Sequence, residues 1–174
     1  MAIRTSKEPD NLQDLNTLIG LIFDSFKSPG CYSELRDATR DLCIVKEELK
    51  HDLLIAYDDN SFVGFCTYGD VSIEKGIYKN AMKSKGLKYE KKSFTISMIA
   101  VMPEQRAKGV GKELVKRVIE EHKKIGHKHS YVTCFGGKCG NSYKMFKSSG
   151  YTELTTMCYH YQDGSEGVVM YKEI

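Results

Sequence analysis

The stretch from Ser93 to Leu114 constrains the fold more than any other part of this 174-residue chain. It begins with an apolar, β-prone run from Phe94 to Val101, followed by a proline, a short basic turn and the start of an amphipathic helix. The first backbone N–H groups of a helix lack partners within the helix and carry partial positive charge, so they attract anions. Glycines in the turn let the backbone approach an anion closely, because they have no Cβ. The pattern predicts a site for a phosphate or a diphosphate.

Basic side chains surround this turn, and the spacing of its glycines limits the kind of phosphate ligand. Arg106, Lys108 and Lys112 supply fixed positive charge. A Walker A loop needs a glycine where Arg106 stands, and a serine or threonine after Lys112, where the chain has Glu113. A dinucleotide-binding fingerprint needs a third glycine where Leu114 stands. Both of these phosphate-binding motifs are therefore excluded.

The spacing that does fit is Arg-x-x-Gly-x-Gly, directly after a strand that ends Val-x-Pro-Glu at Val101 to Glu104. This arrangement resembles the acetyl-CoA-binding segment of the GCN5-related N-acetyltransferases, the GNAT superfamily. The resemblance covers the chain from about Leu53 to the C-terminus and includes the segments Asn141–Tyr151 and Val168–Lys172. A plain strand–turn–helix connection with solvated lysines is the alternative for the short motif alone. The strand before the motif and the helix after it favour the cofactor site.

The resemblance implies that acetyl-CoA lies along this strand and turn. Backbone groups at the end of the strand would hydrogen-bond the pantetheine arm as an added strand does; they belong to Ile99, Ala100 and Val101. Backbone amides of the turn would hold the pyrophosphate; they belong to Arg106, Ala107, Lys108, Gly109, Val110, Gly111 and Lys112. Arg106 could alternatively be a solvated loop arginine. Asn141 and Phe146 are the other expected cofactor contacts, and Asn141 could instead cap its own helix.

Two positions that concern catalysis depart from the pattern of many relatives. An attacking amine must be neutral, so a general base or a water chain must take its proton. Many relatives have a glutamate four residues before the Val of Val-x-Pro, where this chain has Ser97, a possible partner for a relaying water or a plain strand serine. Many have a proton-donating tyrosine four residues before the glycine after the last helix, where this chain has Phe146. Tyr143, one turn earlier, is the candidate donor, with core packing as its alternative.

Other titratable residues are weaker candidates. Asp70 and Glu104 are plausible bases, although solvated loop carboxylates are the commoner case. His122 is expected at the surface near a helix end. A covalent acyl-Cys134 would need an activating base that the sequence does not show. Direct transfer is therefore expected, with proximity supplying most of the acceleration and a backbone amide near Val101 stabilising the oxyanion.

Hydrophobic periodicity along the rest of the chain predicts a mixed α/β fold. A capping box of Asp10 and Gln13 opens one helix, and a second is expected from Ser33 to Leu49. The order is a strand, two helices, three strands, a helix, a strand, a helix and two strands, which suits helices packed on a mostly antiparallel twisted sheet of about seven strands. The resemblance implies the same order, with four or more helices. It also implies a central parallel pair, Phe94–Val101 and Ser130–Phe135, splayed around the cofactor.

The segment from Asp70 to Lys92 interrupts this pattern. Residues 72 to 92 hold seven lysines and two glutamates, so the positive charge of the chain is concentrated there. Its periodicity is weak, and a short helix is expected around Asn80 to Lys83. Long excursions in compact domains are usually functional or mobile. We expect Lys75 to Lys92 to be mobile, because few apolar residues anchor it.

Length and composition exclude several classes of protein. The chain has the size of one domain, taken as residues 1–174, and a net charge of +3 is too small to argue for nucleic acid. No apolar run approaches the roughly 20 residues that span a bilayer, and the N-terminus lacks a secretory signal. A cytoplasmic protein with no membrane partner is expected. The six cysteines form no CxxC pair, so no metal is expected.

The sequence therefore predicts an acetyl-CoA-dependent N-acetyltransferase acting on a primary amine of a small molecule or a peptide. An acyl-CoA-binding sensor with little catalysis is the alternative, because Ser97 and Phe146 replace the usual catalytic residues. A basic nucleic-acid-binding protein is a third option, based on Lys75 to Lys92, but no recognition motif supports it. Aminoglycoside, polyamine, amino acid, peptide N-terminus and lysine side chain all remain open as acceptors. A homodimer is an option because dimers are common in the resembled family.

Overall fold

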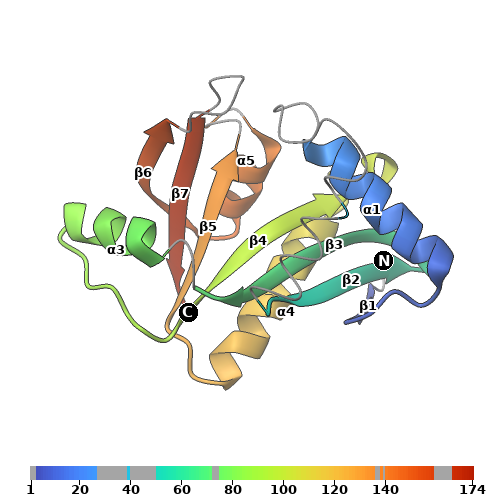
Figure 1. Cartoon of the computed structure of the whole chain (residues 1–174), viewed down its shortest axis with the longest axis horizontal. Helices are drawn as coiled ribbons and strands as arrows, with labels where there is room; N and C mark the ends of the chain where they lie inside the picture. The colour runs from blue at the N-terminus through green and yellow to red at the C-terminus, as the bar shows by residue number, and fades with distance from the viewer. Residues whose placement is uncertain are drawn as a thin grey trace.

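Seven strands form one sheet in the order β1-β2-β3-β4-β5-β7-β6 (Figure 1). The computed structural model describes residues 3–26, 39, 50–71, 75–135, 138, 140–158 and 166–174. Its elements are β1 Arg4–Ser6, α1 Leu12–Phe26, β2 Asp52–Asp58, β3 Ser61–Asp70, α3 Lys75–Ser84, β4 Ser93–Val101, a 3-10 turn Pro103–Gln105, α4 Val110–Lys124, β5 His129–Phe135, α5 Asn141–Ser148, β6 Thr152–Cys158 and β7 Glu166–Glu173. The predicted helix from Ser33 to Leu49 lies outside the described residues, apart from Thr39.

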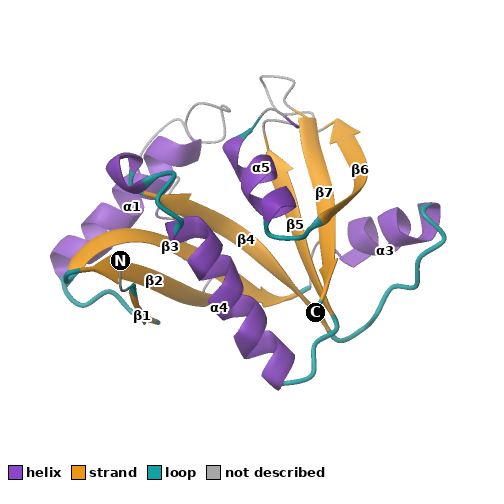
Figure 2. Ribbon diagram, turned by 180° about the vertical axis from the view of Figure 1, so that it is seen from behind, coloured by secondary structure: helices purple, strands orange, loops and turns teal. Residues whose placement is uncertain are grey.

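All strand pairs in the sheet are antiparallel except the central pair, β4 and β5. This confirms the predicted mixed α/β class and the predicted parallel pair. The parallel pairing is short, because it joins only Ser93–Ile96 to His129–Val132. Beyond these residues the two strands diverge, as Figure 2 shows from the side of α4 and α5. The sheet therefore consists of two halves that are joined at one end only.

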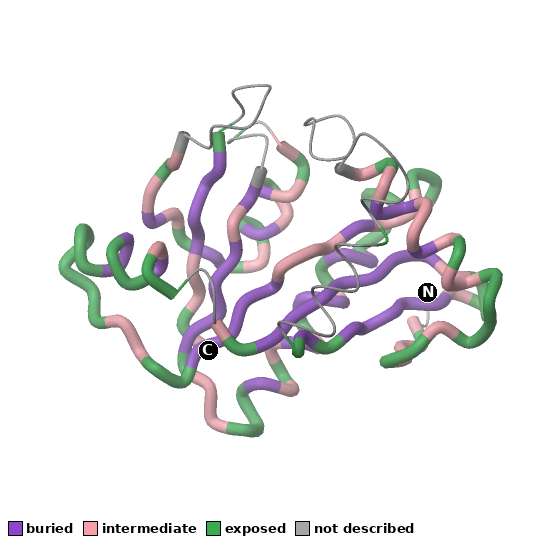
Figure 3. Tube along the Cα trace, viewed as in Figure 1, coloured by how far each residue is buried: buried purple, intermediate pink, exposed green. Residues whose placement is uncertain are grey.

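Helices cover both faces of this sheet. On one face, α4 packs on β2 to β4, and α5 packs on the half formed by β5 and β7. On the opposite face, α1 packs on β2 to β4, and α3 packs on β5, β6 and β7. Most residues of β2 and β3 are buried, whereas the second half of β4 is mostly half-buried (Figure 3). Each half-sheet thus has its own helix on each face, and the line between the halves follows β4 and β5.

The predicted cap of the first helix is wrong in detail. Asn11 caps α1, because its side-chain Oδ1 accepts a hydrogen bond of 2.9 Å from the backbone N–H of Asp14. Asp10, which was expected to form the capping box, pairs with Arg4 instead. Asp and Asn are both favourable N-cap residues. Asn11 is the cap here because β1 places Arg4 beside Asp10, and Asp10 pairs with it.

The expectation that few apolar residues anchor Lys75 to Lys92 is wrong for the first half of this segment. Residues 75–84 form α3, in which Tyr78, Ala81 and Met82 are buried. The ring of Tyr78 stacks on that of Tyr131, with 4.7 Å between centroids. Its hydroxyl lies 3.1 Å from the Oγ1 of Thr95. Helix α3 is therefore anchored to the sheet through one face, and its lysines occupy the other.

His122 is a buried residue rather than the surface residue that the sequence suggested. It lies in the last turn of α4, and its ring stacks on Phe94 with 3.9 Å between centroids. Burial, and then the neighbouring His127, lower the pKa of His122 to about 4. Ile125, which follows the helix, is 62% exposed. In the described ranges, no helix is long and apolar enough to cross a membrane.

Candidate functional site

The divergence of β4 from β5 leaves part of the β4 backbone facing away from any strand partner in the described chain. The N–H of Met102 bonds the carbonyl of Val63, at 3.0 Å, so the backbone groups of Met102 point toward β3. Because alternate residues of a strand direct their N–H and C=O groups to opposite sides, those of Ala100 also face β3, and those of Ile99 and Val101 face the β5 side. Of the three predicted pantetheine contacts, Ile99 and Val101 have the orientation that an added extended ligand requires.

The basic turn after β4 leads into a helix whose N-terminus has no side-chain cap. Gly109 is the N-cap, with φ 91°, and no side-chain hydrogen bond caps α4. Glu113 is the first residue whose N–H bonds within the helix, to Gly109 O at 3.0 Å. Four amides precede it, namely those of Gly109, Val110, Gly111 and Lys112. These N–H groups, at the positive end of the helix dipole, suit a diphosphate.

The backbone of this turn also has a strained conformation, which directs several of its N–H groups to the same side. Ala107 has φ 62°, a left-handed conformation that non-glycine residues adopt at a cost of roughly 1 kcal/mol. Left-handed residues at a turn direct successive N–H groups into one concave surface that binds anions. Residues 106–109 are exposed, so such a surface is accessible to a ligand.

Arg106 connects this turn to the end of β4. Its Nε donates a hydrogen bond of 3.1 Å to the carbonyl oxygen of Val101. The guanidinium is thereby held at the end of β4, where the pantetheine arm of acetyl-CoA is predicted to lie. Lys108 donates to Gln105 Oε1 at 3.2 Å, and Lys112 is exposed on the first turn of α4.

Helices α4 and α5 approach each other closely beside this turn. A Cβ placed on Gly111 would lie 2.6 Å from the Sδ of Met145 in α5, which is too close for ordinary packing. Gly111 therefore allows the N-terminus of α4 to pack against α5. Asn141 is the first residue of α5 and is exposed, and Gly140 is the N-cap without a side-chain hydrogen bond. The helix-capping alternative for Asn141 is thus wrong.

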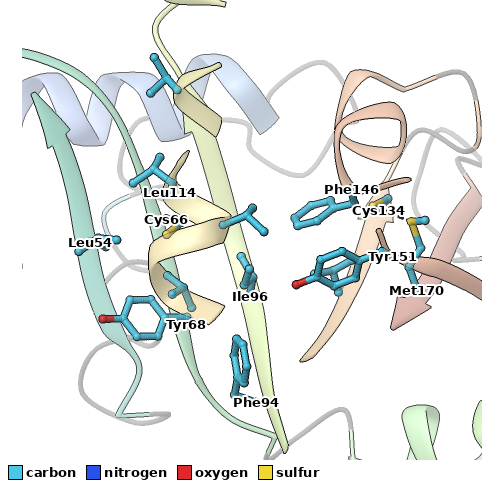
Figure 4. Packing of buried hydrophobic residues seen from close by; sticks show 14 of the residues in the cluster. Leu54, Cys66, Tyr68, Phe94, Ile96, Leu114, Cys134, Phe146, Tyr151 and Met170 are labelled. Carbon is cyan, nitrogen blue, oxygen red and sulfur yellow. Dashed lines mark hydrogen bonds between the residues drawn. The ribbon is translucent and has the colours of Figure 1, made fainter. Parts of the chain in front are cut away.

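The two aromatic candidates on α5 lie in different surroundings. Phe146 is buried, and its ring packs edge-on against Tyr151, with 5.1 Å between centroids. Figure 4 shows both rings on the β5 side, across from Ile96 of β4. The hydroxyl of Tyr143 instead donates to Glu153 Oε2 at 3.2 Å. Glu153 belongs to β6, the strand at the far edge of the sheet, so this hydroxyl is directed away from the β4–β5 divergence.

Ser97 occupies an irregular position on β4. The β3–β4 register passes from Thr67↔Met98 to Tyr68↔Ile96, so Ser97 is the extra residue of a β-bulge. It is also the first residue of β4 beyond the parallel pairing with β5. Bulges bend a strand and redirect a side chain, and they are frequent next to active sites. Ser97 therefore stands at the point where the two half-sheets separate.

The side chain of Ser97 contacts His51, a residue that the sequence analysis missed. Ser97 Oγ lies 2.8 Å from His51 Nδ1, and His51 Nε2 lies 3.4 Å from the carbonyl oxygen of Asp70. His51 is only 5% exposed, and this burial lowers its pKa. No short motif marks this histidine, because the two residues are 46 positions apart and meet only through the pairing of β2, β3 and β4.

The other candidate groups lie in less suitable positions for acid–base or nucleophilic chemistry. Burial raises the pKa of the Cys134 thiol to about 12, so little thiolate is present at neutral pH. The carboxylate of Asp70 is 84% exposed and pairs with His127, Oδ1 to Nε2, at 3.0 Å. Glu104 is exposed on the 3-10 turn. Among the described residues, no group of three or more His, Cys, Asp or Glu side chains could hold a metal ion.

Comparisons with known proteins agree with this architecture. The acetyltransferase (GNAT) family model matches residues 15–151. The structure is similar to ribosomal-protein-alanine N-acetyltransferase from Brucella melitensis (TM-score 0.70, 18% identity, 100% of both chains covered) and to Ard1 from Thermoplasma volcanium (TM-score 0.71, 15% identity, 100% and 99% covered). It is also similar to a chain of the NatC complex solved with Gag peptide and CoA (TM-score 0.69, 14% identity, 100% and 99% covered). No curated protein matches the sequence significantly. The chain therefore belongs to the GNAT family of acetyltransferases and is an acetyl-CoA-dependent enzyme.

Proposed function

We propose that the chain transfers the acetyl group of acetyl-CoA to a primary amine by direct attack of the amine. The observation that carries this proposal is the combination of a diverging parallel strand pair with an uncapped, basic helix N-terminus at one end of it. The pantetheine arm of acetyl-CoA is extended and suits the exposed backbone of the diverging strand. Its diphosphate suits the helix N-terminus. Acetyl-CoA supplies a thioester carbonyl that is already activated toward amines.

The residues present fit this co-substrate in two places. The amides of Gly109 to Lys112, with Arg106 beside them, suit the pyrophosphate, because they combine helix-dipole charge with unpaired donors. The backbone groups of Ile99 and Val101 suit the pantetheine arm, because they face the β5 side of β4. One of these two amides would stabilise the negative charge that develops on the thioester oxygen.

Direct attack is favoured over a covalent acyl-enzyme route. Cys134, the cysteine on β5, is buried and its pKa is raised to about 12. Its Sγ lies 3.8 Å from the Sδ of Met170, within the apolar core. A nucleophilic cysteine needs a base or a lowered pKa. Holding the amine and the thioester together is then the main source of acceleration.

The acceptor class is tested with a screen of pooled amines. Wild-type protein is mixed with acetyl-CoA and kanamycin, spermidine, free amino acids, or a short peptide with a free N-terminus and an internal lysine, and released CoA thiol is measured. Amine-dependent thiol release, with an acetylated amine identified by mass spectrometry, is the expected result. Saturable acetyl-CoA binding without turnover on any amine would instead support an acyl-CoA sensor.

The cofactor site is tested with charge reversals that have a matched control. Arg106→Glu and Gly109→Asp place a negative charge beside the predicted pyrophosphate, so acetyl-CoA affinity should fall by about tenfold or more. Lys116→Glu makes the same charge change as Arg106→Glu, on an exposed position later in α4, and should leave affinity unchanged. Isothermal titration calorimetry measures all three. Equal affinity of both turn variants and the wild type would remove the assignment.

A further inference from the structure

We propose that Ser97 and His51 form a proton relay, in which Ser97 contacts the attacking amine and His51 receives the proton through the Ser97 hydroxyl. This inference rests on the proposed function and names the group that replaces the usual glutamate. The contact that carries it is the 2.8 Å approach of Ser97 Oγ to His51 Nδ1 at the β4 bulge. The bulge lies where β4 leaves β5, beside Ile99 and Val101, so the hydroxyl is next to the predicted thioester position.

A glycine on the intervening strand makes this contact sterically feasible. His51 precedes β2, Ser97 is on β4, and β3 runs between them, so the two side chains would normally be a full strand apart. A Cβ placed on Gly69 of β3 would lie 2.2 Å from His51 Cδ2. The imidazole therefore lies across β3 in the space that a side chain at position 69 would fill. The residues that flank Gly69 in the sequence do not indicate that it makes room for an imidazole.

The hydrogen bonds of the imidazole assign its tautomer. A backbone carbonyl can only accept a hydrogen bond, so the contact of Nε2 with Asp70 O places the proton of neutral His51 on Nε2. The lone pair of Nδ1 is then directed at Ser97, whose hydroxyl donates to it. This is the arrangement in which a base draws a proton from a hydroxyl group, with a third group orienting the base.

The charge state of His51 at neutral pH suits a proton acceptor. Burial lowers the pKa of His51, while the backbone carbonyl of Asp70 and the charges of Asp70 and Asp52 oppose this effect. Among the described residues, those two carboxylates are the charged groups that act on the ring, from β2 and β3, and on β4 the ring contacts the Ser97 hydroxyl. The imidazole is therefore neutral at pH 7 and can accept a proton.

The proposed step balances in atoms and charge. The new N–C bond forms as the thioester C–S bond breaks, and the electron pair of the broken bond leaves on sulfur. The amine proton passes to Ser97 Oγ while the Ser97 proton passes to His51 Nδ1. Solvent later removes the proton from His51, and water protonates the thiolate. No oxidant or further reactant is needed.

The kinetic test replaces the proton acceptor while keeping its hydrogen bond. His51→Asn keeps an acceptor oxygen near Ser97 but cannot take up a proton, and kcat with the best amine of the screen should fall by about 100-fold. Ser97→Ala should cause a similar loss. Acetyl-CoA affinity, measured by calorimetry, should not change in either variant. His129→Asn is the matched control, since His129 is also buried at the start of a strand, and it should keep wild-type turnover.

The pH profile separates a proton-accepting role from a structural one. With an acceptor amine that titrates above pH 8, log(kcat/KM) of the wild type should rise with a slope of 1 near neutrality. Below the pKa of His51, which burial lowers, the slope should steepen to 2, because the amine and the relay must both lose a proton. His51→Asn should keep a slope of 1 throughout. Identical profiles and turnover in the two proteins would overturn the relay.

A rescue variant and a steric variant test the same inference independently. Ser97→Glu in the His51→Asn background places a carboxylate directly at the bulge, so at least tenfold of the lost turnover should return. Gly69→Ala should displace the imidazole and reproduce the loss, whereas Gly76→Ala, at an open position of α3, should not. Failure of the rescue, together with wild-type turnover of Gly69→Ala, would contradict the relay.

A spectroscopic test does not depend on finding an acceptor. Nitrogen-15 NMR of the imidazole should show neutral His51 at pH 7, with the proton on Nε2, and Ser97→Ala should shift the Nδ1 resonance. A proton on Nδ1 would overturn the relay whatever the amine screen shows. Acetyl-Ser97, found by mass spectrometry after incubation with acetyl-CoA alone, would also overturn it, because the serine would then be a nucleophile. Absence of wild-type turnover on every amine would count against the proposed function.

Discussion

At the scale of single residues, the surroundings of Tyr143 argue against a role as proton donor to the leaving thiolate. Its hydroxyl donates to Glu153, and Lys147 Nζ lies 3.5 Å from the same oxygen. Lys138 also pairs with Glu153, at 2.7 Å. The hydroxyl thus lies among the charged side chains of Glu153, Lys138 and Lys147, at the outer edge of the sheet. We propose that water protonates the thiolate, whose basicity is modest, with a reference pKa of about 8.5.

The substitution Tyr143→Phe tests this assignment. It removes the hydroxyl and keeps the ring in the core, so kcat should stay within about threefold of the wild type. Loss of a dedicated acid would cost about 10²–10⁴-fold. Steady-state kinetics with the best amine of the screen decides between the two, and calorimetry checks that acetyl-CoA affinity is unchanged. A 100-fold fall in kcat alone would restore Tyr143 as the donor.

At the scale of elements, α3 attaches the lysine-rich segment to the sheet through a few aromatic and apolar contacts. Tyr78 contributes to this attachment through its ring, which stacks on Tyr131, and through its hydroxyl, which reaches Thr95 and Thr133. Thr95 and Thr133 belong to β4 and β5, so one side chain of α3 contacts both strands near the end of their parallel pairing. The lysines at positions 75, 79 and 83 are exposed. Order in this segment therefore depends on packing and not on its composition.

Removing the Tyr78 side chain should release α3. Truncation of a fully buried aromatic residue costs about 3 kcal/mol or more of unfolding free energy, which urea denaturation measures. Limited trypsin digestion followed by mass spectrometry should show faster cleavage after Lys79 and Lys83 in Tyr78→Ala than in the wild type. Asn80→Ala changes an exposed position of the same helix and serves as the control. Equal cleavage rates in all three proteins would mean that Tyr78 does not hold the helix.

At the scale of the whole molecule, the contacts that join the two half-sheets include the β4–β5 pairing and the packing of α4 against α5. Four parallel residue pairs join β4 to β5, and Gly111 of α4 packs against Met145 of α5 on one face. Between these contacts lies the region where the strands diverge. The relative position of α4 and α5 therefore determines how the helix N-terminus is placed beside β4.

A larger side chain at Gly111 should disturb this arrangement. Gly111→Val forces Met145 aside, and overpacking of this kind costs typically about 1–3 kcal/mol of unfolding free energy. Acetyl-CoA affinity should fall as well, because the amide of this residue is one of the predicted pyrophosphate donors. Adding Met145→Ala should recover most of the stability in thermal unfolding. If the double variant is no more stable than Gly111→Val, then the two side chains are not coupled.

Much of the fold and the cofactor site follows from local sequence patterns. A β-prone run, a proline, a basic glycine turn and an amphipathic helix predicted β4, the turn and α4 because each depends on neighbours within a few residues. The order of the strands followed from periodicity in the same way, and the parallel pair from the family resemblance. The predicted N-cap of α1 was wrong by one position. Asp10 and Asn11 are both suitable caps, but Asp10 pairs with Arg4, so Asn11 caps the helix.

The tertiary structure alone decided the residues that surround the reaction centre. The contact of His51 with Ser97 depends on the registers of three strands, a bulge, and a glycine that leaves room for an imidazole. The burial of His122 and the direction of the Tyr143 hydroxyl depend likewise on partners distant in sequence. A local pattern records which face of a helix or strand is apolar, but it does not record which side chain lies opposite. Side chains that exchange protons must meet within about 3 Å, and only the packed sheet sets such distances.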